Sequence, residues 1–174
     1  MYKTAVWNIR GLNNPYKKTE VLSWIKKNKV DVVALLEVKL QENKWEEAVK
    51  RCIPDDPWNA EFSTVDGGRA RILLLWNGAN TKIRNFVKSY FFMSCEVEAD
   101  NKKFGLIVVY ASNNQGDRMV TWDEIEKAGG KFNGCWLCMG DFNWVKDQRD
   151  KMNGNSVRER DTVDFREFLA KTGL

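Results

Sequence analysis

The sequence predicts one α/β domain, and three observations support this. Segments of strand length alternate with segments of helical periodicity. The 174 residues are 43% hydrophobic and 30% charged, which is typical of a globular domain with one core. The apolar runs are continuous rather than alternating, so we expect strands that are covered on both faces. These runs are Lys3–Ile9, Val30–Leu36, Arg71–Trp76, Phe104–Ala111 and Cys135–Met139.

Two helices are predicted in the first third of the chain. Residues 19–28 place three apolar side chains on one face, with Thr19 as a possible N-cap. Residues 43–53 follow the i, i+3, i+4, i+7, i+8 spacing of a buried stripe, and Pro54 ends this helix. The two inward faces comprise Val21, Leu22 and Ile25 in the first helix and Trp45, Ala48, Val49, Cys52 and Ile53 in the second.

The middle of the chain, residues 60–100, lacks helical periodicity. Asp66-Gly67-Gly68 separates two apolar stretches, as a hairpin turn does. The predicted order is therefore β-α-β-α, a β-hairpin region, and then β, α, β, α.

Two further helices are predicted after this region. Residues 117–128 end at Gly129-Gly130, and residues 161–171 have Asp161 as N-cap and Gly173 as the C-terminal glycine. Their inward faces are predicted to comprise Met119, Trp122 and Ile125 in the former and Phe165, Phe168 and Leu169 in the latter.

Composition excludes several classes of function. The chain has no histidine, which excludes Ser-His-Asp hydrolases, Cys-His proteases and histidine-built zinc sites within it. The net charge of +4 permits a polyanionic partner without requiring one. No apolar run reaches membrane-spanning length and no signal peptide begins the chain. We therefore expect an intracellular protein, nuclear or cytoplasmic, with reduced cysteines and no membrane partner; its oligomeric state stays open.

Polar side chains follow the predicted strands. Asn8, Glu37, Asn113, Asp141 and Asn143 each stand where an apolar run finishes. Such positions form sites in open α/β sheets, and carboxylates with amides suit Mg²⁺ or Mn²⁺. The alternative is that each is an ordinary turn residue.

Three other signals have competing interpretations. Cys135 and Cys138 have the spacing of a redox or zinc motif, but no second pair accompanies them, so buried structural cysteines are expected. Trp144 is a candidate for stacking on a nucleic-acid base. The alternative is that Trp144 is part of the core. The basic run 146–160 is either a phosphate-backbone contact or, since it also holds acidic residues, a solvated loop.

Five short strings occur in one order along the chain. They are Trp7-Asn8-Ile9-Arg10-Gly11-Leu12, the run from Asp31 to Glu37, Gly68-Arg69 before Ile72–Trp76, Val109-Tyr110-Ala111-Ser112-Asn113, and Met139-Gly140-Asp141-Phe142-Asn143. This order resembles the endonuclease/exonuclease/phosphatase superfamily, most of all the endonuclease domain of plant LINE-type non-LTR retrotransposons. The resemblance implies a four-layer α/β sandwich, with two mixed sheets face to face and helices outside. It implies DNA as substrate and a longer polyprotein with reverse transcriptase as partner.

The resemblance also implies roles for the residues at the strand ends. Glu37 would bind the catalytic Mg²⁺ or Mn²⁺, and Asn8 would help to hold the metal or the phosphate. Asp141 would orient or activate the attacking water, and Asn143 would contact the scissile phosphate.

Further matched positions would contact the DNA. Tyr110 and Asn113 match a Tyr-x-x-Asn string in which the tyrosine hydrogen-bonds a phosphate oxygen. Arg10 stands where abasic-site enzymes carry an acidic residue, which favours the retrotransposon branch. Arg10 and Trp144 are therefore the candidate substrate-binding residues.

The sequence departs from the family at its C-terminal end. The family continues into a second acidic residue and a Ser-Asp-His string, whereas this chain has neither the string nor any histidine. We therefore expect residues 1–174 to form one C-terminally incomplete domain of marginal stability. A general acid or base supplies about 10²–10⁴ in rate, so the chain alone is expected to be weak or inactive.

The leading hypothesis is thus a Mg²⁺-dependent phosphodiesterase domain that nicks DNA. One alternative is a non-catalytic remnant of a retrotransposon. Another is a phosphodiesterase of the same superfamily that acts on a phosphoester other than nucleic acid.

Overall fold

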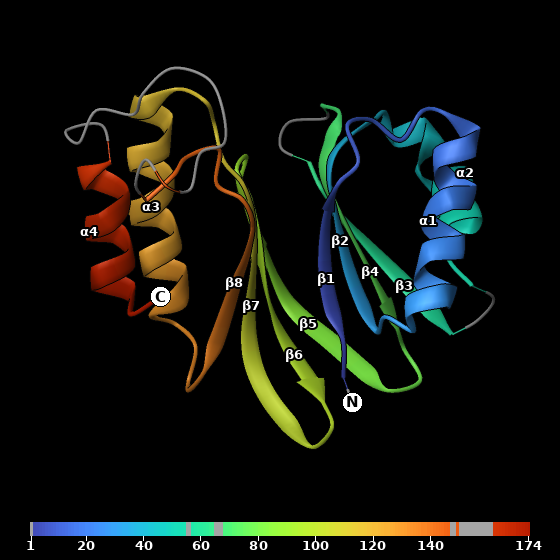
Figure 1. Ribbon diagram of the computed structural model, residues 1–174. Helices are drawn as coiled ribbons and strands as arrows, with labels where there is room; N and C mark the ends of the chain where they lie inside the picture. The colour runs from blue at the N-terminus through green and yellow to red at the C-terminus, as the bar shows by residue number, and fades with distance from the viewer. Residues whose placement is uncertain (1, 55–56, 65–67, 147–148, 150–161) are drawn as a thin grey trace.

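The computed structural model describes residues 2–54, 57–64, 68–146, 149 and 162–174. Two four-stranded sheets pack face to face, and helices lie on both outer sides (Figure 1). The predicted four-layer α/β sandwich is therefore confirmed. The first sheet has the order β1 (Thr4–Asn8), β2 (Val32–Leu40), β4 (Ala70–Asn77), β3 (Trp58–Ser63). The second has the order β5 (Thr81–Lys88), β6 (Phe92–Ala99), β7 (Lys102–Tyr110), β8 (Trp136–Asp141).

Each sheet combines one parallel pair with antiparallel strands. Strands β1 and β2 are parallel and joined through α1 (Pro15–Asn28), while β7 and β8 are parallel and joined through α3 (Gln115–Gly129). Parallel strands end at the same edge of a sheet. Asn8 accordingly pairs with Leu36, and Tyr110 pairs with Asp141. The polar residues that follow these strands are thereby collected at one end of the sandwich.

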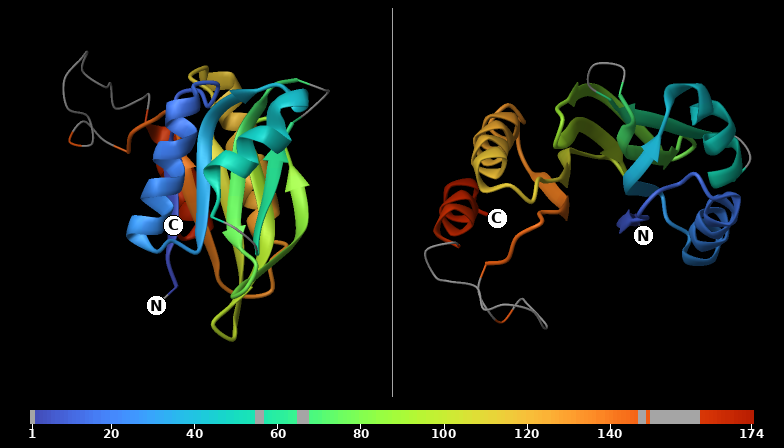
Figure 2. Two further views of the ribbon diagram at one scale, coloured as in Figure 1. Left: turned by 90° about the vertical axis from the view of Figure 1, so that its right-hand side faces the viewer. Right: turned by 90° about the horizontal axis from the view of Figure 1, so that it is seen from above.

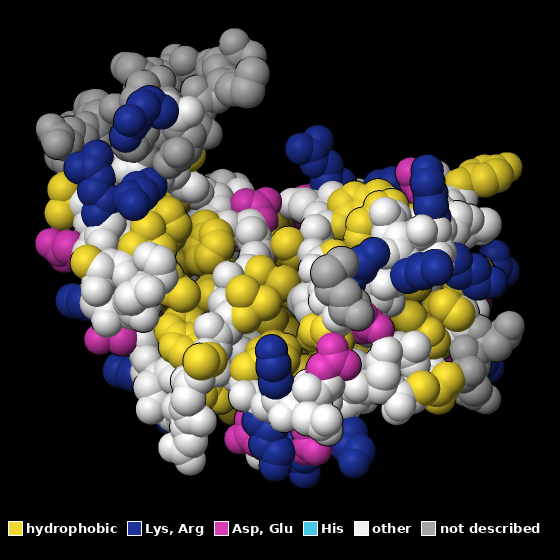
Figure 3. Space-filling model, turned by 60° about the horizontal axis from the view of Figure 1, so that its bottom comes forward, with side chains coloured by type: hydrophobic (Ala, Val, Ile, Leu, Met, Phe, Trp, Pro, Cys, Tyr) yellow, Lys and Arg dark blue, Asp and Glu magenta, His cyan; other side chains and the backbone are white. Residues whose placement is uncertain are grey.

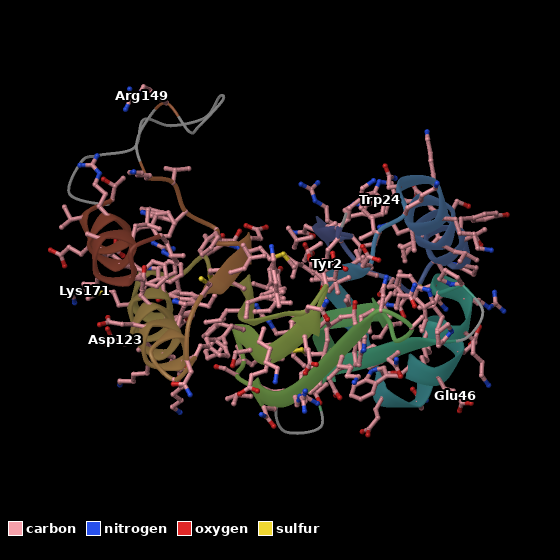
Figure 4. The ribbon with its side chains drawn as sticks, turned by 90° about the horizontal axis from the view of Figure 1, so that it is seen from below. Tyr2, Trp24, Glu46, Asp123, Arg149 and Lys171 are labelled. Atoms are coloured by element: carbon pink, nitrogen blue, oxygen red, sulfur yellow. The ribbon has the colours of Figure 1, made fainter. Side chains whose placement is uncertain are left out.

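Three apolar layers hold the elements together. The inner faces of the two sheets form the central layer, with Leu36, Leu74, Met93 and Val108 among its buried residues. Helices α1 and α2 (Trp45–Cys52), with the 3₁₀ turn η1 (Glu42–Lys44) before α2, pack on the outer face of the first sheet. Helices α3 and α4 (Val163–Thr172) cover the second sheet (Figure 2). Figure 4 shows this arrangement through its labels, with Glu46 of α2 on one outer side and Asp123 and Lys171 on the other.

The expectation of strands covered on both faces holds for the interior strands only. Strands β2 and β4 are buried almost throughout and β7 is buried from Gly105 to Val109, whereas β1 and β8 are mainly half-exposed. Among the described strands both lie at the edge of their sheet, so each has one strand beside it and the neighbouring layers cover it incompletely. Val6 and Leu137 are exposed there, and hydrophobic side chains are visible on the lower face of the molecule in Figure 3.

Helix α1 begins earlier than predicted. Asn14 is its N-cap and accepts a hydrogen bond from the Tyr16 backbone N–H at 2.9 Å, with Pro15 in the first turn. The prediction of Thr19 as N-cap is therefore wrong. An Asn-Pro pair favours a helix start more strongly than a lone threonine does. The asparagine side chain accepts a free backbone N–H of the first turn, and proline fixes φ at a helical value.

The inward face of α3 differs from the prediction by one residue. Trp122 and Ile125 are buried as expected, but Met119 is 53% exposed and Arg118 is only 1% exposed. The Arg118 guanidinium has backbone carbonyl partners, described below, which is why a charged side chain takes the place predicted for an apolar one.

The remaining elements largely follow the prediction. In α4 Phe165 and Phe168 are buried, Leu169 packs beside them, and Gly173 ends the helix with φ 71°. Strands β3 and β4 form the expected antiparallel hairpin. Asp66, Gly67 and the predicted N-cap Asp161 lie outside the described residues, as does most of the basic run 146–160. None of the described helices has the length and apolar character needed to cross a membrane.

Candidate active site

A β-bulge places Glu37 at the carboxyl end of β2. The register between β2 and β4 shifts between Leu36 and Leu40. Within the bulge Glu37 and Lys39 have φ values of 58° and 57°, a region that side chains other than glycine rarely adopt. Bulges of this kind re-aim a side chain and are common beside active sites. Here the bulge turns the Glu37 carboxylate to the rim of the sandwich.

The Glu37 carboxylate is held in its ionised form. Its Oε1 lies 2.5 Å from the Lys39 Nζ. This hydrogen bond and the charge of Lys39, together with a hydrogen bond from Asn8 and the charge of Arg10, lower the pKa of Glu37 despite an opposing effect of burial. At neutral pH the carboxylate is therefore available as a negatively charged ligand.

Asn8 connects the two sheets across the site. Its Nδ2 donates to Oδ2 of Asp141 at 2.9 Å, and its amide also hydrogen-bonds Glu37. Its Oδ1 accepts the backbone N–H of Arg10 at 3.2 Å, which fixes the orientation of the amide. One amide from β1 thus joins the carboxylate of β2 to the carboxylate of β8.

Asp141 is positioned by amide groups. Its Oδ1 accepts the backbone N–H of Asn143 at 3.0 Å, and the Asn143 side chain donates to the carbonyl of Ala111 at 2.7 Å. Gly140 brings β8 close to β7, because a Cβ at this position would lie 2.0 Å from the Val109 carbonyl oxygen. A residue with a side chain cannot occupy position 140 without moving the strand that carries Asp141.

Tyr110 ends β7 beside Asp141. Burial and the nearby charge of Glu37 raise the pKa of its hydroxyl, while Arg71 and Lys39 oppose the shift. The hydroxyl therefore stays protonated at neutral pH and can donate a hydrogen bond to an anionic oxygen.

Arg118 is a residue that sequence reasoning missed. From α3, its Nη1 donates to the carbonyl of Asn113 at 2.7 Å and lies 3.4 Å from that of Ser112. Its guanidinium carbon lies 3.9 Å from the ring centroid of Trp144, which packs against the apolar layer under α3 and α4. One buried cation thus braces the loops after β7 and β8. No sequence pattern distinguishes Arg118 from a solvated helix residue.

The predicted site residues fall into two groups. Asn8, Glu37, Asp141 and Asn143 form one hydrogen-bonded set, with Tyr110 beside it. Arg10 joins this set through its backbone. Asn113 and Trp144 are tied to Arg118 instead; the Asn113 side chain is exposed, and one face of the Trp144 ring is covered.

The donor set fits a hard divalent cation. Glu37 supplies carboxylate oxygens and Asn8 an amide oxygen, which are groups that Mg²⁺ and Mn²⁺ prefer, and the Asp141 carboxylate is hydrogen-bonded to the same Asn8 amide. The Lys39 ammonium forms an ion pair with Glu37, which shows that the Glu37 carboxylate attracts a cation. Among the residues that the structure describes, no three His, Cys, Asp or Glu side chains gather as metal ligands. A metal here would therefore keep several water ligands, as Mg²⁺ commonly does.

The cysteine pair forms no second centre. Both cysteines are free thiols. Burial raises the pKa of Cys138 to about 12, which makes its thiol unreactive. Cys135 is exposed just before β8, so the expectation of a buried structural cysteine is wrong at this position, where the strand has not yet begun.

The same strand ends and the same order of elements define a known group of proteins. A model of the endonuclease/exonuclease/phosphatase family matches residues 5–173. The chain belongs to this family. A comparison with curated proteins finds no match.

Solved structures of this fold include an AP endonuclease, a TDP2 and a phosphatase. The AP endonuclease LMAP from Leishmania major has a TM-score of 0.70 at 14% identity, covering 98% of this chain and 66% of that one. A humanized D. rerio TDP2 has a TM-score of 0.66 at 15% identity, covering 92% and 68%. A mannosyl-6-phosphatase of Bacteroides thetaiotaomicron has a TM-score of 0.66 at 11% identity, covering 95% and 70%.

At these identities the likeness shows the shared fold. The chain spans about two thirds of the length of these three proteins, and 60% of D. rerio TDP2 complexed with a single strand DNA product.

Proposed function

We propose that this chain is a Mg²⁺-dependent phosphodiesterase domain that nicks DNA. The observation that carries this proposal is the Asn8 amide, which joins Glu37 and Asp141 where the two sheets end. Two carboxylates and a fixed amide at this edge form a hard-oxygen site suited to phosphoryl chemistry. The names of two neighbours, an AP endonuclease and a TDP2 complexed with single strand DNA product, support DNA as the substrate.

The residues of this site divide the work of hydrolysis. Glu37 and Asn8 would hold the metal, which would neutralise phosphate charge and lower the pKa of a bound water. Each oxygen of Asp141 accepts one hydrogen bond from the protein, so lone pairs remain to orient a water and receive its proton. Tyr110 and Asn143 donate to phosphate oxygens. Since the chain has no histidine, we expect a rate about 10²–10⁴ below that of a site with a better-matched base.

The Trp7–Leu12 string and the Gly140–Asn143 string support the retrotransposon endonuclease type, in a plant LINE element whose polyprotein also carries reverse transcriptase. Arg10 at the rim is consistent with a contact to the DNA backbone. A remnant without catalysis is the alternative from the same descent. A second candidate substrate class, a sugar phosphoester, is favoured only by the mannosyl-6-phosphatase neighbour.

The test is nicking of supercoiled plasmid by the purified chain with Mg²⁺ and with EDTA. Glu37→Gln and Asp141→Asn remove the two carboxylate charges, and each is expected to reduce the nicking rate severalfold or more at the Mg²⁺ concentration that half-saturates the wild-type chain. Glu46→Gln is the matched control, because Glu46 is an exposed glutamate on α2 (Figure 4).

Each outcome decides between the alternatives. Nicking that needs Mg²⁺ and keeps its full rate only in the Glu46 variant supports the proposal. A wild-type nicking rate in Glu37→Gln at this Mg²⁺ concentration contradicts the assigned site. No nicking by a chain shown to be folded by circular dichroism supports the remnant, and hydrolysis of mannose 6-phosphate instead supports the sugar phosphoester.

A further inference from the structure

A pocket of about 270 Å³ opens beside Glu37. It lies where β2, β4 and β7 meet the turn between β5 and β6. Its wall includes Glu37, Lys39, Arg69, Arg71, Tyr90 and Tyr110. The roles proposed above use only Glu37 and Tyr110 from this set.

Arg71 has an unusual environment in this pocket. Its guanidinium carbon lies 4.3 Å from the ring centroid of Tyr90 and 4.6 Å from that of Tyr110. Its Nη2 donates to the Tyr110 carbonyl at 3.3 Å, whereas its buried Nε has no hydrogen-bond partner among the described residues. The aromatic rings therefore hold the cation by cation–π attraction in a fixed plane.

Arg71 has no paired carboxylate among the described residues. Of the charged residues that line the pocket, Lys39, Arg69 and Arg71 are cations, and Glu37 is the one described carboxylate, already paired with Lys39. The pocket thus carries an excess of positive charge and a guanidinium in the flat geometry that suits a phosphate.

Tyr90 adds an aromatic surface to this positive charge. It is 52% exposed although one of its faces meets Arg71, so the ring remains accessible to solvent. The rings of Phe91 and Tyr90 pack in a T-shaped arrangement with their centroids 4.8 Å apart, which fixes the orientation of the Tyr90 ring. An exposed ring next to a phosphate-binding cation is the arrangement that holds a single-stranded nucleotide.

We propose that this pocket binds the nucleotide next to the cleaved phosphodiester. Arg71 pairs with the phosphate of that nucleotide and Tyr90 stacks on its base. The inference rests on the proposed function, because it makes the substrate of the same site a polynucleotide.

The test measures binding in EDTA, so that it does not depend on catalysis. A fluorescein-labelled single-stranded oligonucleotide of thymidines is titrated with the chain, and anisotropy is followed at several NaCl concentrations. Arg71→Met is expected to weaken binding at least about tenfold, since it removes a charged hydrogen bond. It should also lower the slope of log Kd against log salt by about 0.7, the value for one contact to a single strand. Arg71→Lys keeps the slope but loses part of the affinity, because lysine keeps the charge without the planar stack.

Matched controls separate the pocket from general charge. Arg84→Met removes an exposed arginine on β5 that pairs with Glu98, and should leave both affinity and slope unchanged. Tyr90→Ala should weaken binding severalfold, whereas Tyr16→Ala, at an exposed tyrosine on α1, should not. In competition, a 5′-phosphorylated thymidine dinucleotide should displace the oligonucleotide at lower concentration than inorganic phosphate.

The contrary results are equally clear. Wild-type affinity and slope in a folded Arg71→Met chain would overturn the inference, and so would failure of the wild-type chain to bind at low salt. Equal competition by inorganic phosphate would overturn the stacking on Tyr90. Binding that depends on Arg71 in a chain that never nicks plasmid supports the pocket while rejecting the proposed activity.

Discussion

The two carboxylates of the site are held in different ways. Glu37 lies in a bulge of β2, at positive φ, with the Lys39 ammonium on its Oε1. Asp141 ends a regular strand and accepts hydrogen bonds from the amides of Asn8 and Asn143, with no ion pair to a cation among the described residues. The Glu37 carboxylate thus lies in contact with a positive charge, whereas the orientation of the Asp141 carboxylate is fixed by neutral donors.

This difference separates binding from chemistry. A carboxylate that already attracts an ammonium is suited to ligate a metal ion. A carboxylate fixed by two neutral donors keeps its orientation and its remaining lone pairs for a water molecule. The contrast can be tested by perturbing each half in a matched way.

The largest expected effect is a split between metal affinity and turnover. Glu37→Gln should raise the Mg²⁺ concentration for half-maximal nicking about 10–100-fold, because a metal ligand loses its charge. Asp141→Asn should lower the rate at saturating Mg²⁺ about 10²–10⁴-fold with little change in that concentration. Nicking rates across a Mg²⁺ titration measure both the half-maximal Mg²⁺ concentration and the rate at saturation. If the two variants change the same one of these quantities, Glu37 and Asp141 share one role.

The next effect concerns the stability of the Asp141 half. Gly140→Ala places a Cβ 2.0 Å from the Val109 carbonyl oxygen. We expect the free energy of unfolding to fall by about 3 kcal/mol or more. Gly11→Ala is the control in the Glu37 half, since Gly11 also has positive φ, 92°, but its Cβ would meet nothing within 4 Å. Backbone strain alone should cost about 1–2 kcal/mol there.

Urea unfolding of both variants checks this prediction. Equal losses of stability would show that φ rather than the close approach of β8 to β7 governs position 140.

The sequence predicted the strands better than it predicted the site. Continuous apolar runs located the interior strands β2, β4 and β7, because these are buried on both faces. Strand ends also indicated which polar residues gather. The bulge at Glu37 has no local signal, and the bond from Asn8 to Asp141 joins residues 133 apart. The Thr19 error was avoidable, because the adjacent pair Asn14-Pro15 is a local signal of a helix start. The Met119 error was not, because a buried arginine depends on partners outside the local pattern.

Arg118 tests whether the Asp141 half is braced from α3. Arg118→Met removes the donor to the Asn113 carbonyl and the stack on Trp144. We expect a loss of about 1–3 kcal/mol in the free energy of unfolding, since a partly buried acceptor loses its charged donor. Arg84→Met removes an exposed arginine paired with Glu98 and should cost less than about 1 kcal/mol. A loss no larger than that of the control would contradict the brace.

The smallest effect concerns the pKa of Glu37. A carboxylate whose pKa is lowered by folding contributes stability above the pKa it has in the unfolded chain, and loses it as pH falls through the lower folded value. Lys39 supplies the largest cause of that lowering, by its hydrogen bond to Glu37. Lys39→Met should therefore raise the pKa of Glu37 and cost about 0.2–1 kcal/mol at neutral pH, because Lys39 is more than half exposed.

NMR titration of the Glu37 side chain measures this change, and urea unfolding at pH 7 and at pH values below the folded pKa measures its cost. The difference between wild type and Lys39→Met should vanish at the acidic end, where Glu37 is protonated in both. Lys50→Met is the control, because it breaks the exposed pair with Glu46 on α2 and leaves Glu37 untouched. A pKa for Glu37 that does not move in Lys39→Met would mean that Asn8 and Arg10 alone keep it ionised, and the contrast between the two carboxylates would then rest on the bulge rather than on Lys39.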